Sequence, residues 1–275
     1  MTERFDFHRW RLVILGTVII SVILICAIFA PWIAPFSPYD LDYMAMLQGP
    51  GATHWLGTDE IGRDILSRII YGARISMQVA FIAAGIGLVF GAVIGVTAAY
   101  FGGIVDLILM RFMELLFSFP AILLAVVLMA SLGTSVLNAM IAIGIVFIPG
   151  FSRLARAATE VVLREQYVES ARAIGMSHTR ILLREIMPNI IAPLLVEAAV
   201  AFSYAILLES ALSFLGLGAQ PPEPTWGNML NTGRGFMAQS AIMSIAPGMA
   251  IFLTVIGFNL VGDGLRDALD PHMKD

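Results

Sequence analysis

The stretch SMQVAFIAAGIGLVFGAVIGVTAAY, residues 76–100, decides the fold class of this 275-residue chain. It contains no charged side chain over 25 residues, and a helix needs about 20 apolar residues to cross the hydrocarbon core of a bilayer. The stretch therefore predicts a transmembrane helix. Its glycines Gly87, Gly91 and Gly95 recur at every fourth position, a spacing that lets a neighbouring helix pack closely. The alternative interpretation is that glycine is simply common in membrane helices.

The composition of the whole chain indicates the same environment. Hydrophobic residues make up 59% and charged residues 13%, with a mean hydropathy of +0.87, whereas an average soluble domain is about 45–50% apolar and about 25% charged. These values exclude a water-soluble globule and a disordered chain. The single cysteine, Cys26, excludes an intrachain disulfide. No segment is basic enough to predict a nucleic-acid partner, so the expected surroundings are membrane lipid.

Further segments with few or no charges predict additional spans. The 38 residues between Glu114 and Arg153 carry no charge and are too long for one crossing, and the turn-prone cluster Ser131–Ser135 divides them into two. Lipid satisfies no backbone polar group, so every span is expected to be helical. The sequence thus predicts an all-α membrane protein with six transmembrane helices: residues 12–30, residues 76–100, two spans within 115–152, residues 190–212 and residues 238–261.

The first of these spans has a second interpretation. Residues 12–30 follow Arg4, Arg9 and Arg11, as the apolar region of a secretory signal peptide would. Their length exceeds the roughly 7–15 residues of such a region, and no small-x-small cleavage site follows. We therefore expect an uncleaved membrane helix.

The distribution of basic residues predicts the orientation of the spans. Cytoplasmic loops are enriched in Lys and Arg, and six of the sixteen basic residues lie between the fourth and fifth spans. We therefore expect cytoplasmic termini at residues 1–11 and 263–275, and a cytoplasmic loop at 153–189. Residues 31–75 then form an extracytoplasmic loop, and residues 76–262 form a core of five transmembrane helices.

The cytoplasmic loop is predicted to hold two short helices joined by a glycine turn. A helical pattern covers Tyr167–Ile174 and stops at Gly175, which tolerates positive φ. Ser177 is a candidate N-cap for a second helix that starts at His178 and that Pro188 is expected to end. Such a compact element with an apolar face is suited to docking in the groove of a partner protein.

The sequence of this loop resembles the Glu-Ala-Ala loop of ATP-binding-cassette importer permeases. The shared pattern is Glu169-Ser170-Ala171-Arg172-Ala173-Ile174-Gly175, followed by Pro188. In that family the loop forms a coupling helix, which sits in a groove of the ATPase subunit and transmits its closure. The resemblance implies that the ATPase-coupling residues are Glu169, Ser170, Ala171, Ala173, Gly175, Met176, Ser177 and Pro188. The chain departs from the family pattern at Ser170 and Met187, which keep the usual size, and at Glu185, which replaces an apolar residue.

Three other stretches are similar to the dipeptide, oligopeptide and nickel permease subfamily, and to its second, C-type subunit. They are His54-Trp55-Leu56-Gly57-Thr58-Asp59, Ser213-Phe214-Leu215-Gly216-Leu217-Gly218 and Phe258-Asn259-Leu260-Val261-Gly262-Asp263-Gly264. The resemblance implies the type I ABC importer permease fold and a place in the bacterial cytoplasmic (inner) membrane. It also implies that the chain forms half of a translocation pathway for di- or oligopeptides. Nickel, glutathione, opine or sugar substrates are the alternatives.

The same resemblance implies partners. They are a homologous permease subunit in a heterodimer, two cassette ATPase subunits and an extracytoplasmic substrate-binding protein. ATP and Mg would belong to the ATPases. No cofactor is expected in this chain, which lacks the phosphate-cradling Gly-x-x-x-x-Gly-Lys-Ser/Thr pattern.

The remaining polar residues predict neither an enzyme nor a metal site. The histidines are scattered over loops and both faces of the membrane, at His8, His54, His178 and His272. Glu209 and Asn259 are polar residues within spans and hence candidates for the translocation pathway. A secondary transporter or channel would need intramembrane charge pairs or matching halves with broken helices, and a membrane-embedded enzyme would need clustered His, Asp or Glu. Neither pattern is evident.

Overall fold

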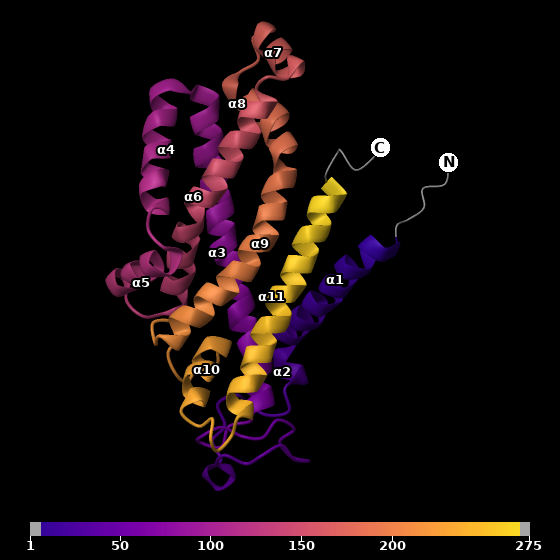
Figure 1. Ribbon diagram of the computed structural model, residues 1–275, viewed down its shortest axis with the longest axis vertical. Helices are drawn as coiled ribbons and strands as arrows, with labels where there is room; N and C mark the ends of the chain where they lie inside the picture. The colour runs from indigo at the N-terminus through magenta and orange to yellow at the C-terminus, as the bar shows by residue number, and fades with distance from the viewer. Residues whose placement is uncertain (1–6, 270–275) are drawn as a thin grey trace.

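The computed structural model describes residues 7–269, and within them it contains helices and one isolated bridge between Thr58 and Asp64, but no strand. Figure 1 shows the long helices running along the length of the molecule, with α7 and α8 at one end and α10 at the other. The elements are α1 (Phe7–Ile28), α2 (Ala30–Ile33), η1 (Tyr43–Ala45), α3 (Ile65–Phe101), α4 (Gly103–Phe117), α5 (Ala121–Leu132), α6 (Val136–Val162), α7 (Gln166–Ala173), α8 (His178–Ile181), the π-helical turn η2 (Leu182–Ile186), α9 (Met187–Phe214), α10 (Trp226–Arg234) and α11 (Ile242–Leu269).

Five helical segments are long and apolar enough to cross a membrane, and a sixth span exists if the bent pair α4 and α5 is counted as one. The five are Arg11–Ile28, Ile65–Phe101, Val136–Val162, His178–Phe214 and Ile242–Ala268. This confirms the all-α membrane fold. The outer parts of the expected termini, residues 1–6 and 270–275, lie outside the described residues.

The third span differs in shape from the one expected within residues 115–152. It starts earlier, with α4 at Gly103, and α4 meets α5 at an angle of 93°. Pro120 lies at the break and has no N–H to continue the hydrogen bonds of α4, so the helix must restart after it. The turn between α5 and α6 lies where the sequence placed it: Gly133 has a φ of +89°, and Ser135 accepts a hydrogen bond from the backbone N–H of Asn138.

The second span begins eleven residues before Ser76, at Ile65, inside the expected loop 31–75. Asp64 caps this helix, because its side chain accepts a hydrogen bond of 2.8 Å from the backbone N–H of Ser67. Arg68 then lies in the first turn and is only 5% exposed. In the sequence the charge of Arg68 indicates a loop, but in the folded protein this side chain is buried and paired with Asp59.

The expected loop 153–189 is shorter in the structure, because helices extend into it from both sides. α6 continues to Val162. Pro188 does not end a helix, contrary to the prediction, but occupies the first turn of α9, where a missing N–H costs little. The π-helical turn η2 precedes it, and the side-chain amide of Asn189 donates to the carbonyl of Glu185 at 2.6 Å. The chain is therefore helical from His178 to Phe214.

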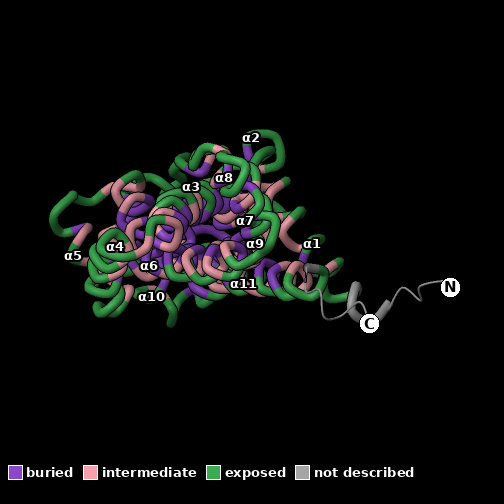
Figure 2. Tube along the Cα trace, turned by 90° about the horizontal axis from the view of Figure 1, so that it is seen from above, coloured by how far each residue is buried: buried purple, intermediate pink, exposed green. Residues whose placement is uncertain are grey.

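The core lies where α3, α6 and α9 meet, and Figure 2 shows buried residues gathered there while α4, α5 and α1 are largely exposed. α3 and α6 touch along the glycines of the quoted stretch. A Cβ atom built on Gly87 would lie 2.5 Å from the Cβ of Phe147, one on Gly91 would lie 2.4 Å from the Cβ of Phe151, and one on Gly95 would lie 2.1 Å from a backbone oxygen of Ser152. Only glycine permits this approach; we call it the α3–α6 seam.

Replacing Gly91 by valine is expected to destabilise the protein through the seam. The new Cβ would be forced against Phe151 and the backbone of α6, and overpacking of this kind costs about 1–3 kcal/mol. Thermal unfolding of the purified protein in detergent should show a lower midpoint. Gly85→Val is the matched control, because a Cβ on Gly85 meets nothing within 4 Å. Equal midpoints for the two variants would show that the seam does not limit stability.

Candidate functional site

The loop between α6 and α9 is built around a glycine turn. Gly175 has a φ of +75°, and the backbone N–H groups of Gly175 and Met176 donate to the carbonyls of Arg172 and Ala171, each at 3.0 Å. This pair of hydrogen bonds is the Schellman motif that ends many helices. It stops α7 and directs the chain into α8, as the sequence predicted.

The turn presents a mostly exposed surface beyond the ends of the spans. Figure 1 shows α7 at the extreme end of the molecule. Val168, Ala171 and Ile181 are buried and fix the two short helices, whereas Ile174 is 78% exposed. An exposed isoleucine at a helix end is available for a partner.

The structure brings most of the candidate coupling residues onto or beside this surface. Ala171 is buried and Met176 is half-buried. Ser177 precedes α8 as expected, but its side chain makes no capping hydrogen bond. Pro188 lies apart from the turn, in the first turn of α9. The exposed residues are Glu169, Ser170, Ala173, Gly175, Ser177 and Pro188.

A contact that the sequence did not predict fastens this loop to the end of α3. The hydroxyl of Tyr100 lies 2.7 Å from Nδ1 of His178. The guanidinium carbon of Arg172 lies 5.5 Å from the centre of the Tyr100 ring, and the rings of Phe101 and His178 lie 6.2 Å apart. These four residues, with Met176, line a cavity of about 440 Å³. Tyr100 and His178 are 78 positions apart, so no local spacing could have revealed the contact.

A second link at the same end joins α4 to α6. Arg156 donates to both carboxylate oxygens of Asp106, at 2.6 and 2.8 Å, and lies 2.9 Å from Glu160. A bidentate arginine–carboxylate pair fixes orientation as well as distance. The start of α4 is therefore held against the C-terminal third of α6.

The two pathway candidates lie in different surroundings. Glu209 is only 2% exposed, and one of its carboxylate oxygens accepts a hydrogen bond of 2.8 Å from Ser213. In this chain it is thus enclosed by protein and does not line an open surface. Asn259 is exposed on α11.

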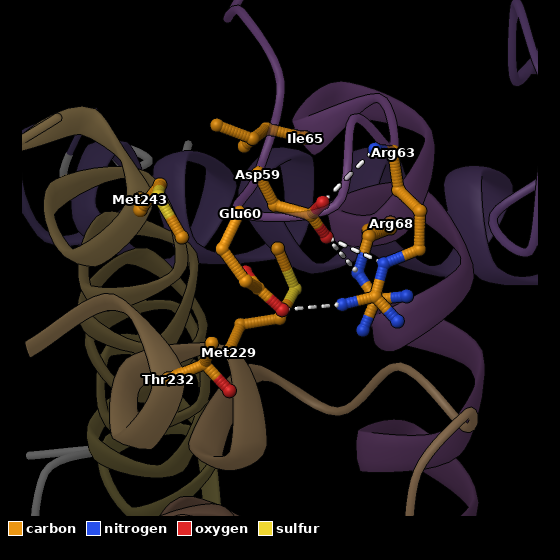
Figure 3. A pocket seen from close by; sticks show the side chains of 8 residues that line it. All are labelled: Asp59, Glu60, Arg63, Ile65, Arg68, Met229, Thr232 and Met243. Atoms are coloured by element: carbon orange, nitrogen blue, oxygen red, sulfur yellow. Dashed lines mark hydrogen bonds and ion pairs between the residues drawn. The ribbon is translucent and has the colours of Figure 1, made fainter. Parts of the chain in front are cut away.

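The opposite end of the molecule holds a buried network of charges. Arg63 donates to Asp59 at 2.6 Å and to Glu60 at 3.0 Å, while Nε of Arg68 lies 3.6 Å from Asp59. Arg68 also donates to the carbonyl of Pro38 at 3.0 Å. Figure 3 shows both guanidinium groups facing the two carboxylates beside a small cavity. Each arginine is therefore paired with a carboxylate, so that neither leaves an uncompensated charge in the buried network.

Comparison with known proteins identifies the class. The chain belongs to the family of binding-protein-dependent transport system inner membrane components, whose sequence pattern matches residues 87–275. Residues 4–50 match the N-terminal transmembrane domain of oligopeptide transport permease C. The chain is therefore a multi-pass permease subunit of an ABC importer in the inner membrane, a family that works with ATPase and substrate-binding partners.

Two permease subunits are similar to this chain over nearly its whole length. The dipeptide transport system permease protein DppC of Alkalihalophilus pseudofirmus is 46% identical over 96% of this chain and 87% of its own length. The glutathione transport system permease protein GsiD of Escherichia coli is 44% identical over 98% of this chain and 89% of its own length.

Solved structures support the fold. The MetNI methionine ABC transporter in inward-facing conformations matches with a TM-score of 0.61 at 16% identity, covering 75% of this chain and 98% of that chain. An amino acid ABC transporter with histidines matches with a TM-score of 0.55 at 15% identity, covering 74% of this chain and 95% of that chain.

Removing the shared carboxylate of the charge network is expected to destabilise the end of the molecule that contains it. Asp59→Asn would leave Arg63 and Arg68 buried with one carboxylate, and breaking a buried ion pair costs about 3–5 kcal/mol. Thermal unfolding and proteolysis of segment 34–64 should both reveal the loss. Asp40→Asn is the control, because Asp40 is exposed and forms no ion pair within residues 7–269. Equal stability of the two variants would contradict a structural role for the network.

Proposed function

We propose that this chain forms half of a translocation pathway for di- and oligopeptides and pairs with a homologous permease subunit. Two ATPase subunits would dock on the cytoplasmic loops, and a substrate-binding protein would deliver the peptide on the other side. ATP and Mg would be held by the ATPases. The relatives that transport dipeptides and glutathione support a peptide substrate.

The observation that carries the proposal is the α7–α8 loop. It combines a Glu-Ala-Ala-like sequence with a glycine-closed turn whose outer surface is exposed at the end of the molecule. This placement favours cytoplasmic termini, since the last turn of α11 points to the same side. The exposed residues Glu169, Ser170, Ala173 and Ile174 would enter the groove of an ATPase, as helices do in groove recognition.

Three contacts would carry movement of this loop into the membrane. The Tyr100–His178 hydrogen bond leads to α3, the α3–α6 seam leads on to α6, and the unbroken helix from His178 leads to α9. Closure of the ATPases would therefore displace three spans at once. Alternating access requires an element with two conformations whose equilibrium is shifted by a ligand.

The function is tested with the complex purified through a tag on this chain. Reconstituted in liposomes with its binding protein, it should accumulate a radiolabelled dipeptide only with ATP, and unlabelled di- and tripeptides should compete. Competition by nickel or sugars, without competition by peptides, would assign another substrate. Uptake without ATP by the chain alone would indicate a secondary transporter.

Gly175→Val is expected to uncouple transport. A β-branched residue is strained at φ +75°, so the turn would shift and the ATPase contact would be lost. We expect at least a tenfold lower ratio of peptide transported to ATP hydrolysed, with normal amounts of chain in the membrane. Gly175→Asn is the matched control, because asparagine tolerates positive φ. Full transport by the valine variant would overturn the coupling role.

Tyr100→Phe is expected to weaken coupling without loss of the fold. It removes the hydroxyl that meets His178 and keeps the ring under Arg172. A single hydrogen bond contributes about 0.5–1.5 kcal/mol, so the transport-to-ATP ratio should fall about two- to tenfold. Tyr204→Phe, at an exposed tyrosine whose hydroxyl has no hydrogen bond within residues 7–269, serves as control. Identical ratios for the two variants would remove Tyr100 from the coupling path.

A further inference from the structure

A cavity of about 700 Å³ lies between α6, α9 and α11. Its lining comes from the first turns of α9, from the last turns of α11 and from Leu154 of α6, so it belongs to the same half of the molecule as the α7–α8 loop. Most of the lining is apolar and small. Pockets of about 300–1,000 Å³ with such walls hold small organic ligands.

Three ionisable side chains line this cavity: Glu197 on α9, and Asp263 and Arg266 on α11. Glu197 is half-buried ten residues into α9, whereas Asp263 and Arg266 are exposed near the end of α11. Within residues 7–269 none of the three forms an ion pair or a side-chain hydrogen bond. Of the three, Glu197 lies within an apolar helix, where an ionisable group without a partner is costly and marks a candidate functional site. The three side chains are thus open to a charged ligand.

The backbone adds a further acceptor. Pro193 has no N–H, so the carbonyl four residues earlier, that of Asn189, receives no intrahelical hydrogen bond from it. Both residues line the cavity. Two carboxylates and a carbonyl without its usual intrahelical donor suit an ammonium group, whereas the guanidinium of Arg266 suits a carboxylate.

We propose that this cavity is a binding station on the cytoplasmic side for a zwitterionic peptide during import. The α-ammonium group lies between Glu197 and Asp263, and the terminal carboxylate lies at Arg266. Asp263 and Arg266 are three positions apart on one helix, which makes them neighbours on its surface, and Glu197 faces them from α9. The apolar remainder of the wall accepts peptide side chains without selecting among them. This station rests on the proposed peptide-import function and names the residues that would hold the substrate.

The same ammonium-and-anion chemistry occurs in the headgroup of phosphatidylethanolamine. The experiment must therefore determine whether a peptide or this lipid occupies the cavity. The chain's single cysteine, Cys26, makes a direct occupancy assay possible, because Cys26→Ala leaves this chain without a thiol and labelling can be read on its own band. Val196→Cys then places one reactive thiol in the cavity lining.

The test uses the complete nucleotide-free complex in liposomes of phosphatidylglycerol alone, and again with phosphatidylethanolamine added. Alanyl-phenylalanine should slow maleimide labelling of Val196→Cys, whereas its N-acetylated form should not. Protection should fall about tenfold when Glu197→Gln and Asp263→Asn are introduced together, because charge-assisted hydrogen bonds are lost. Asp267→Asn, an exposed neighbour on α11 that does not line the cavity, should leave protection unchanged.

Other outcomes overturn the station. Equal protection by the free and N-acetylated peptides would exclude recognition of the ammonium group. Protection that follows phosphatidylethanolamine and ignores the peptide would assign the cavity to lipid. Intact ATP-driven peptide uptake without any protection would reject the station and leave the proposed function standing, whereas absence of peptide uptake altogether would reject the function itself.

Discussion

The close approach of α3 to α6 is the constraint on which the rest of the structure depends. Lipid tails are as apolar as leucine, so helices in a membrane associate mainly through close packing and gain little from hiding apolar surface. Gly87, Gly91 and Gly95 bring the backbone of α3 against Phe147 and Phe151 without room for a Cβ. The first turn of α3 carries Arg68 of the charge network, and its last turn carries Tyr100, which contacts the α7–α8 loop. The seam therefore fixes the position of both ends of α3 relative to α6.

The few charged side chains of this protein stabilise it at the positions where they form ion pairs. At one end of the molecule Asp59 pairs with two arginines, and at the other end Arg156 binds Asp106 and Glu160. The first network joins the loop before α3 to the first turn of α3, and the second joins α4 to α6. In each case a helix extends past a charge that, unpaired, would have ended the span. A span predicted from an uncharged run is therefore too short wherever the folded protein pairs a flanking charge with an opposite charge.

Local signals predicted local structure well, and the remaining features depend on contacts between distant residues. The turns at Gly133–Ser135 and Gly175 lie where the sequence placed them, because positive φ and capping are properties of a few adjacent residues. The six spans and the family followed from apolar runs and motifs. The passage of the helix through Pro188 was missed, since a proline either ends, bends or begins a helix according to its neighbours. The hydrogen-bond partner of His178, Tyr100, lies on another element, 78 positions away.

The α7–α8 loop is linked to two helices of unequal stiffness, α3 and α9. α3 contains no proline over 37 residues and is packed along the seam. α9 follows a π-helical turn, has Pro188 in its first turn and contains Pro193, so the part nearest the α7–α8 loop lacks hydrogen bonds that a regular helix would have. A displacement of α7 and α8 therefore bends α9 more readily than α3. Glu197 lies one turn beyond Pro193 and faces the cavity between α9 and α11. The helix that can change shape is thus the one that carries the charged wall of that cavity, and its bending alters the distance between Glu197 and the two charges of α11.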